Sequence, residues 1–273
     1  MTPSEQRSNL AQQYQAEGYV IVRNAIDADL VREVVAHVAW LQHRYPTIRP
    51  EAFSGNELNM KDDPFWVRLI SDDRLLDIAE QFIGPNIGLF ASHYIAKPPF
   101  DGQAVLWHQD GSFWPLEPMD VITLWLAADD VDAENGCMQV IPRTQQLDLQ
   151  QLQVRQDVAN ALGASMNETL VDESKAVDVV LKAGDVSVHH PNVIHGSKPN
   201  NSSRWRRGLT IRYIPSTTRI LCDGPWGMAF HLRGSAPTGV NVYQPWPTYS
   251  DGKHMPFRDT QGWNERASMW NAR

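Results

Sequence analysis

Hydrophobic and polar positions follow two different periods along this chain, and the period changes near residue 86. Before that point, one segment carries apolar residues every three or four positions, the spacing that places side chains on one face of a helix: Leu30, Val31, Val34, Val35, Val38 and Leu41. The pattern predicts a helix over 27–44 that is capped by Asp27 and ends before Pro46. A further helix is predicted at about 72–82, and the β-branched segment 18–23 predicts a strand between two helices.

From about residue 86, short apolar runs alternate with Pro, Gly, Asp and Asn, which is typical of an all-β barrel or sandwich. The predicted strands are 87–97, 104–107, 121–128, 138–141, 177–181, 186–189 and 208–214. Residues 143–176 break this rhythm with Gln, Asp and Glu, and we expect an insertion, either a lid over a binding site or a solvated surface segment without a role. The proline-containing residues 216–273 are expected to wrap the barrel as irregular structure.

Composition narrows the range of partners. The chain has 24 Lys and Arg against 32 Asp and Glu, a formal net charge of -8, so it offers no broad positive field for nucleic acid or an anionic membrane. No apolar run approaches the ~18 residues that span a bilayer, and no apolar signal core follows the first residues. Cys137 and Cys222 allow at most one disulfide. We therefore expect a cytoplasmic protein, a monomer or homodimer, that acts on a small molecule.

Candidate metal chemistry lies in two segments. His108 and Asp110 are two positions apart in a predicted strand, so their side chains point to the same face. With the distant His195 they supply two imidazoles and one carboxylate, a set that binds Fe(II) and leaves three coordination positions open. His-x-Asp alone occurs by chance, but Arg206, eleven residues after His195, and the β-rich sequence around these residues strengthen the metal interpretation.

Other residues have competing interpretations. His93, His189 and His190 are either core or turn histidines or supporting groups near the site. The arginines near the second motif are either solvated charges or a buried anchor; in a regular strand Arg204, Arg206 and Arg212 share one face and Arg207 takes the other. A buried arginine needs an anionic partner, and a dicarboxylate would suit its bidentate fork.

These motifs, in this order and spacing, resemble the phytanoyl-CoA dioxygenase family of Fe(II)/2-oxoglutarate oxygenases. The first matching block reads WHQDGSFWP at 107–115, VITLWL at 121–126 and NGCMQVIP at 135–142. The second reads HGS at 195–197, NNS at 200–202 and RRGLT at 206–210. Residues 18–22 are also similar to the family's first strand. The matching blocks are spread over residues 15–215, which is more specific than any single motif.

The resemblance implies a mainly β fold, a double-stranded β-helix (a cupin-like jelly roll) with flanking N-terminal helices. It implies one oxygenase domain over 1–273, with a helical elaboration at about 1–85, a jelly-roll core at about 86–215 and a C-terminal wrap at 216–273. Fe(II) would be the cofactor, 2-oxoglutarate and O2 the cosubstrates, and succinate and CO2 would be released. The implied catalytic iron ligands are His108, Asp110 and His195; Arg206 would hold the C5 carboxylate of 2-oxoglutarate, and the other implied cosubstrate contacts are Thr123, Trp125 and Ser197.

The substrate is expected to be a small metabolite or natural-product intermediate that is hydroxylated at an unactivated C–H bond. Organophosphonates, quaternary ammonium compounds, and desaturation, cyclisation or epoxidation stay open. Asp110 disfavours a halogenase, since related halogenases carry Gly or Ala there. Two other classes remain, a metal-binding β-barrel without turnover and a Zn(II) hydrolase that uses a metal-activated water. Candidate substrate contacts are the 143–176 insertion and His93, Lys97, Trp107 and Trp114.

Overall fold

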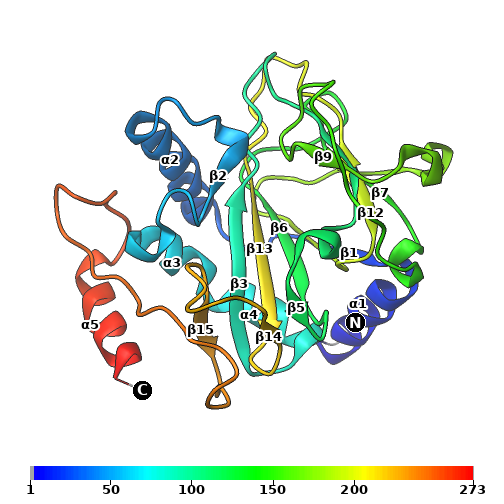
Figure 1. The fold of residues 1–273 in the computed structure, drawn as a ribbon. Helices are drawn as coiled ribbons and strands as arrows, with labels where there is room; N and C mark the ends of the chain where they lie inside the picture. The colour runs from blue at the N-terminus through cyan, green and yellow to red at the C-terminus, as the bar shows by residue number, and fades with distance from the viewer. Residues whose placement is uncertain (1–2, 273) are drawn as a thin grey trace.

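Two antiparallel sheets form the centre of the molecule in a computed structural model that describes residues 3–272 (Figure 1). The larger sheet has seven strands in the order β1-β11-β6-β13-β3-β15, with β2 also paired to β3. Its strands are β1 (Tyr19–Val22), β2 (Phe53–Ser54), β3 (Ile87–Tyr94), β6 (Ile122–Ala127), β11 (Val186–His189), β13 (Gly208–Pro215) and β15 (Phe230–Arg233). The smaller sheet has the order β10-β7-β12-β4, with β4 (Val105–His108), β7 (Met138–Ile141), β10 (Val177–Val179) and β12 (Ile194–Ser197). The short strands β5 (Leu116–Glu117) and β14 (Arg219–Ile220) pair with each other.

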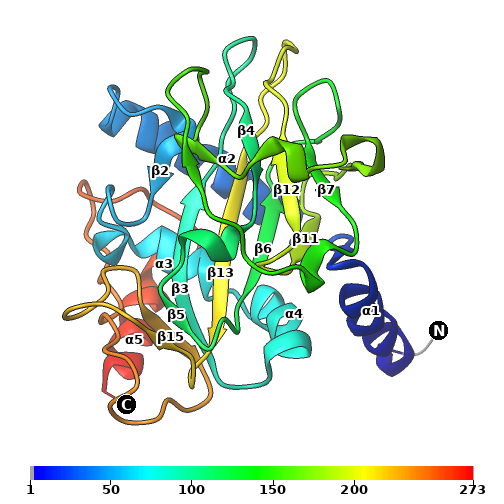
Figure 2. The ribbon, with the colours of Figure 1, turned by 45° about the vertical axis from the view of Figure 1, so that its right-hand side comes forward.

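Helices cover one face of the larger sheet, as the two ribbon views agree (Figures 1 and 2). The helices are α1 (Pro3–Glu17), α2 (Ala28–Arg44), α3 (Pro64–Ile70), α4 (Asp73–Ile83) and α5 (Thr260–Asn271). The capping side chain of Asp27 accepts a hydrogen bond from Leu30 N at 2.7 Å, and Asp72 caps α4 in the same manner. The main hydrophobic core lies between these helices and the sheet.

Alternation along the strands of the larger sheet separates this core from the opposite face. On β6, Leu124 and Leu126 belong to the main core, whereas Thr123 and Trp125 point to the other side. The two faces of a strand alternate with a period of two, so every second residue of β6, β11 and β13 faces away from the helices. That second face lies toward the smaller sheet and provides one wall of the site described below.

The predicted helices and strands correspond closely to the observed ones where the apolar pattern was regular. Strands 138–141 and 186–189 have the predicted bounds, and helices 27–44 and 72–82 appear as α2 and α4. Strand 87–97 ends earlier, at Tyr94, although Lys97 still pairs with Arg206 in an isolated bridge. The sequence did not predict α3, β2 or β12 as separate elements.

The C-terminal part contains regular structure, which differs from the expected irregular wrap over 216–273. Strand β15 pairs with β3 at the edge of the larger sheet, and α5 packs through Trp263 and Ala267. Trp246 stacks against Trp263 at 5.3 Å and against Trp270 at 4.9 Å. Tertiary packing of aromatic residues therefore stabilises a helix whose own apolar periodicity is weak.

The 143–176 segment is not a featureless excursion. It contains a small hairpin of β8 (Gln153–Val154) and β9 (Ala164–Ser165), and β9 lies against β4. Met166 N donates to Trp107 O at 2.9 Å, and Ala161 N donates to Ala104 O at 2.9 Å. The segment is thus fixed to the strand that carries the first metal motif.

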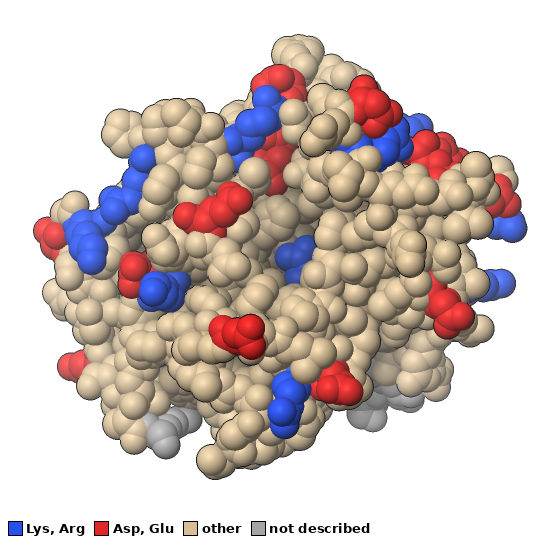
Figure 3. All heavy atoms as spheres, in the orientation of Figure 1, with Lys and Arg blue, Asp and Glu red and all other residues tan. Residues whose placement is uncertain are grey.

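Acidic and basic side chains are interspersed on the face of the molecule shown in Figure 3. The face shown there is hollowed near its middle, and a basic side chain is visible inside the hollow (Figure 3). Cys137 is buried and Cys222 is exposed, and both are free thiols. Within residues 3–272, every helix is too short or too polar to cross a lipid bilayer.

Candidate metal and cosubstrate site

His108, Asp110 and His195 lie together in the structure. One ligand atom from each residue lies within 4.8 Å of the other two, and all three side chains are buried. The two imidazole rings are 4.1 Å apart between centroids, and His108 Nε2 is 3.6 Å from Asp110 Oδ1. The sequence separation of 87 residues between His108 and His195 is closed by the pairing of their strands.

The smaller sheet produces this arrangement. His108 is the last residue of β4 and pairs directly with His195 on the neighbouring strand β12. Directly opposed residues in an antiparallel pair point to the same face, so both rings project to one side of the sheet. After β4 the chain turns into a short 3-10 helix, Asp110–Phe113, which brings the Asp110 carboxylate beside the two rings.

Each imidazole is oriented by a backbone carbonyl. His108 Nδ1 lies 2.8 Å from Leu106 O, and His195 Nδ1 lies 3.0 Å from Val193 O. A carbonyl only accepts, so Nδ1 carries the proton in each ring and Nε2 keeps its lone pair free. This is the hydrogen-bonding pattern that commonly supports histidine ligands of metal ions.

Asp110 has three polar neighbours from the larger sheet. Thr123 Oγ1 donates to Asp110 Oδ2 at 3.0 Å, His189 Nε2 lies 3.4 Å from the same oxygen, and Arg212 lies 3.7 Å from Oδ1. Burial alone would raise the pKa of Asp110, but Arg212, His108 and His189 hold it well below its usual value. Burial, with His108 and His189 nearby, lowers the pKa of His195. The site therefore presents an ionised carboxylate beside a neutral imidazole, the protonation states that metal binding requires.

Arg206 lines the same pocket and is fully buried. Its guanidinium lies over the Trp125 ring at 5.0 Å and makes only long hydrogen bonds, 3.5 Å to Ile95 O and 3.4 Å to Ser197 Oγ. Its Nε has no partner, and no ion pair joins Arg206 to an acidic residue of the described chain. Burial lowers the pKa of Arg206 to about 10, which still leaves the group charged at neutral pH. A buried cation in this state suits an anionic ligand.

Lys97 lies next to Arg206. Its Nζ donates to Ser197 Oγ at 2.7 Å and to Lys198 O at 2.5 Å, and the residue is fully buried. Burial and the nearby Arg206 lower the pKa of Lys97 well below its usual value. Ser197, two residues after His195 on β12, thus connects the metal ligands to the basic end of the pocket.

The other residues expected to contact substrate occupy different places. His93 Nε2 lies 3.2 Å from Glu51 O, and burial together with Arg212 lowers its pKa to about 4. Trp114 stacks under Arg212, whose guanidinium carbon is 5.1 Å from the ring centre. Trp107 lies outside the pocket, because it neighbours His108 on β4 and therefore points to the opposite face, where its Nε1 donates to Glu173.

The arginine prediction holds only in part. Arg206 and Arg212 both line the pocket, and Arg207 points away and pairs with Asp129 at 2.7 Å. Arg204, however, lies in a loop before β13 and forms a surface ion pair with Asp132. The strand alternation does not extend to Arg204, so its expected shared face with Arg206 is wrong.

For His189 and Arg212, which lie near Asp110, the sequence left two interpretations open: a core or turn histidine or a supporting group for His189, and a solvated charge or a buried anchor for Arg212. Both come from the larger sheet, and both line the pocket. Their positions on the same face as Thr123 and Arg206 follow from alternation along β11 and β13, so strand parity was the available signal. His190 is directed elsewhere and lies beside Tyr14.

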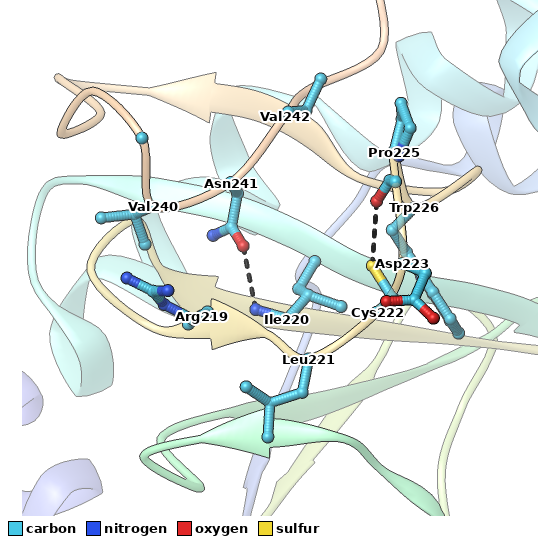
Figure 4. A pocket seen from close by; sticks show the side chains of 12 residues that line it. Arg219, Ile220, Leu221, Cys222, Asp223, Pro225, Trp226, Val240, Asn241 and Val242 are labelled. Carbon is cyan, nitrogen blue, oxygen red and sulfur yellow. Dashed lines mark hydrogen bonds between the residues drawn. The ribbon is translucent and has the colours of Figure 1, made fainter.

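A second, open pocket lies apart from the metal-site candidates (Figure 4). It is formed by residues around β14 and by 239–242, and Ile220 N donates to Asn241 Oδ1 at 2.9 Å across it. The Cys222 thiol in this pocket donates to Gly224 O. None of the metal-site residues lines it, so its chemistry is separate from that of the buried site.

A family model described as phytanoyl-CoA dioxygenase (PhyH) matches residues 14–208. The match covers most of the chain and includes His108, Asp110, His195 and Arg206. The chain belongs to the phytanoyl-CoA dioxygenase family. The resemblance in the motifs is thereby confirmed.

Curated relatives of this chain are named for different substrates. The probable alpha-ketoglutarate-dependent hypophosphite dioxygenase of Stutzerimonas stutzeri is 31% identical over 148 residues, which are 53% of this chain and 51% of that protein. The peroxisomal phytanoyl-CoA dioxygenase of Homo sapiens is 26% identical over 224 residues, 73% of this chain and 66% of that protein. The chain thus spans about half the length of the first relative.

Solved structures share the fold. The apo form of the non-heme monooxygenase ThoJ superposes with a TM-score of 0.74 at 20% identity and covers 96% of both chains. The epimerase SnoN, in complex with Fe3+, alpha ketoglutarate and nogalamycin RO, gives a TM-score of 0.67 at 22% identity over 86% of this chain and 96% of that chain. The mainly β arrangement of antiparallel sheets is therefore the fold of known non-heme oxygenases.

Proposed function

We propose that this protein is a dioxygenase that uses Fe(II) and 2-oxoglutarate to hydroxylate an unactivated C–H bond of a small metabolite or natural-product intermediate, with release of succinate and CO2. One observation carries the proposal: the buried group of His108, Asp110 and His195 shares a pocket with Arg206, a buried cation without an acidic partner. Bound by the three side chains, iron would supply O2 activation coupled to oxidative decarboxylation of 2-oxoglutarate.

The protein's own groups would hold the reacting molecules in place. Hydrogen bonds from Nδ1 of both histidines to backbone carbonyls fix the ring planes, and Thr123 fixes one oxygen of Asp110. Because the ligand atoms are buried, bulk water has little access to the centre. Positioning of this kind accounts for a large share of the catalytic effect in such sites.

Arg206 would bind the distal carboxylate of 2-oxoglutarate through its two-pronged guanidinium. Trp125 supports the guanidinium from one face, and Ser197 and Lys97 supply further polar groups beside it. A ligand carboxylate would compensate the burial of both cations, which otherwise costs several kcal/mol. Thr123 supports Asp110, so we now propose a positioning role for it in place of cosubstrate contact.

We also propose that the two sheets form a double-stranded β-helix within a single oxygenase domain and that the 143–176 segment is a lid. Leu162 from this segment lines the metal-site pocket, and Leu149 lies against Gly111 just after Asp110. These contacts favour the lid over a solvated segment without a role. His93 and Trp114, close to Arg212, are then the substrate-side residues among those expected from the sequence.

A metal-dependent hydrolase on the same ligands is the alternative reaction, and a metal-binding barrel without turnover is the alternative class. Neither gives a reason for a buried arginine without an acidic partner in the pocket. A hydrolase uses a metal-activated water and needs no dicarboxylate anchor. Arg206 and its surroundings therefore favour the oxygenase.

The test is O2-dependent conversion of 2-oxoglutarate to succinate by purified, Fe(II)-loaded protein. Succinate that forms in air but not under nitrogen would support the proposal, even at a low number of turnovers. Asp110→Ala is expected to reduce succinate to the level without protein, and Asp129→Ala, at a part-buried ion pair with Arg207 outside the pocket, is the matched control. Succinate formation that persists in Asp110→Ala, or that does not need O2, would refute the proposal.

A further inference from the structure

Arg212 is a second buried arginine in the metal-site pocket, and 2-oxoglutarate binding at Arg206 gives it no partner. Its side chain is 10% exposed, its Nε has no hydrogen-bond partner, and its Nη1 donates to Thr210 Oγ1 at 2.9 Å. The ring of Trp114 supports one face of the guanidinium. The edge that carries Nε thus remains available for an acceptor.

Asp110 forms an ion pair with Arg212 but no hydrogen bond. The separation of 3.7 Å is too long for a hydrogen bond, and Asp110 Oδ2 already accepts from Thr123. When Asp110 binds a divalent metal, its negative charge is offset by the ion. Arg212 would then be a buried cation without compensation, which costs several kcal/mol.

The charges of the residues that line the pocket also favour an anionic substrate. Among the lining residues, Arg206 and Arg212 face a single acidic side chain, Asp110. Lys97, beside Arg206, lies outside the lining, and the buried carboxylate of Glu51 offsets its charge. The two positive charges of Fe(II) and the two negative charges of 2-oxoglutarate cancel. One positive charge therefore remains in the pocket, and a monoanionic substrate would neutralise it.

Arg212 is also placed at the other end of the site from Arg206. The two residues are six positions apart along one strand direction, so at about 3.3 Å per residue their backbones are roughly 20 Å apart. Asp110 and Thr210 lie at the Arg212 end, and Lys97 and Ser197 lie at the Arg206 end. A cosubstrate anchored at Arg206 leaves Arg212 for a different molecule.

We propose that Arg212 binds an oxyanion group of the substrate, a carboxylate or a phosphorus oxyanion, and so orients the substrate for attack at the metal. The inference rests on the proposed dioxygenase function and adds the chemical class of its substrate. The backbone carbonyl of His93 accepts from Thr210 Oγ1 and so fixes the hydroxyl to which Arg212 donates. A neutral or cationic substrate would leave Arg212 without a counter-charge.

The experiment is an anaerobic calorimetric titration of protein saturated with Fe(II) and 2-oxoglutarate. The probes are acetate and methylphosphonate, with acetamide and dimethyl methylphosphonate as neutral counterparts. We expect saturable binding of at least one anion and at least tenfold weaker binding of its neutral counterpart, since a hydrogen bond to a charged group contributes about 1.5–3 kcal/mol. The tighter anion identifies a carboxylate or a phosphorus oxyanion as the preferred group.

Variants assign the anion to Arg212. Arg212→Gln is expected to weaken the anion at least tenfold, Arg212→Lys to weaken it less, and Arg207→Gln, which loses an arginine on the opposite face, to leave it unchanged. Equal binding of anion and neutral counterpart, absence of saturable anion binding, or wild-type anion affinity in Arg212→Gln would overturn the inference. The last result would indicate direct ligation of the anion to the metal.

Separate measurements keep the two proposals apart. If the wild-type protein does not bind 2-oxoglutarate in the presence of Fe(II), the dioxygenase proposal fails first. If it binds 2-oxoglutarate and the anions fail as above, only the substrate inference fails. Loss of Fe(II) affinity in both Arg212→Gln and Arg212→Lys, with anion preference intact, would make Arg212 a positioning residue for Asp110 and would also overturn the inference.

Discussion

The Asp110 carboxylate is the best-supported group of the proposed metal site. It sits where the smaller sheet ends, yet its hydrogen bond comes from Thr123 on the larger sheet. A hydrogen bond to the Asp110 carboxylate therefore links the two sheets. A substitution at Thr123 should therefore change the affinity for the metal, although Thr123 is not one of the proposed metal ligands.

Thr123→Val should weaken Fe(II) binding by about 10–100-fold, because removing a group that orients a metal ligand commonly has that effect. The variant keeps the shape of the side chain but loses the donor to Asp110 Oδ2. Thr123→Ser retains the hydroxyl and should bind Fe(II) nearly as the wild type does. Equilibrium titration with Fe(II) under nitrogen measures both; equal affinities for the valine and serine variants would contradict the role given to Thr123.

Arg206→Gln should weaken 2-oxoglutarate binding by at least about 30-fold, which corresponds to about 2 kcal/mol for loss of one partner from a buried charge pair. Fe(II) affinity should change little, since Arg206 makes no hydrogen bond to the metal-site residues. The measurement is the KM for 2-oxoglutarate in succinate formation. Arg207→Gln is the neighbouring control, and an unchanged KM in Arg206→Gln would remove the carboxylate assignment.

For single residues, the sequence indicated which side chains could form the site but not which other side chains contact them. His108, Asp110 and His195 were recognisable because two lie in one tripeptide and the third precedes an arginine at a typical distance. The Thr123–Asp110 bond and the approach of Arg212 depend on how the two sheets lie against each other. Sequence spacing does not encode that relation, and parity only restricts which side chains share a face.

A buried polar network connects three elements on the helical side of the larger sheet. His37 on α2 lies 2.9 Å from Asp63 Oδ2 through Nε2 and 2.9 Å from the Tyr94 hydroxyl through Nδ1. Asp63 also caps α3 by accepting from Trp66 N at 3.0 Å. Because Tyr94 ends β3, the network fixes two helices to the sheet that carries one wall of the site.

Asp63→Ala should lower the free energy of unfolding by about 2–4 kcal/mol. The loss combines a helix cap, about 1 kcal/mol, with a buried His37 nitrogen left without its partner, about 1–3 kcal/mol. Asp63→Asn keeps an oxygen acceptor for Trp66 N and should lose less. Urea denaturation at pH 7 measures the difference, and an alanine variant as stable as wild type would show that the network contributes nothing.

The same carboxylate makes stability depend on pH. Burial would raise the pKa of Asp63, but His37 and the hydrogen bond from Trp66 lower it below its usual value. A carboxyl with a depressed folded-state pKa contributes stability that is present above its unfolded pKa, about 3.9, and is lost as pH falls through the folded value. Wild type should therefore lose more stability than Asp63→Asn below about pH 4; parallel curves for the two would contradict this.

Elements with strong periodicity were predictable, and elements stabilised mainly by distant contacts were not. Helix α2 shows regular apolar spacing and a capping Asp27, so its bounds were found within a residue. Strand β12 contains His195-Gly196-Ser197, which lacks the β-branched pattern of a strand, and pairs because β4 and β7 flank it. Helix α5 forms where Trp263 packs on Trp246, a contact that local sequence does not reveal.

In the whole molecule, the two sheets supply different parts of the proposed site. The larger sheet buries its helix-side face in the main core and presents Thr123, Trp125 and Arg212 on the other face. The smaller sheet supplies both histidines, and the 143–176 segment adds Leu162 to the wall. The order and spacing of the family's motifs in the sequence predicted the mainly β fold. They did not predict the substrate, whose identity we expect to depend on the Arg212 end of the pocket.

The central claim is that the His108, Asp110 and His195 group and Arg206 bind Fe(II) and 2-oxoglutarate together. The most direct test is an anaerobic absorbance titration of metal-free protein with Fe(II) and then 2-oxoglutarate. We predict a weak visible metal-to-ligand charge-transfer band that saturates at one equivalent and is absent from folded His108→Ala protein. Iron-loaded, folded wild-type protein that never develops this band with 2-oxoglutarate would contradict the claim.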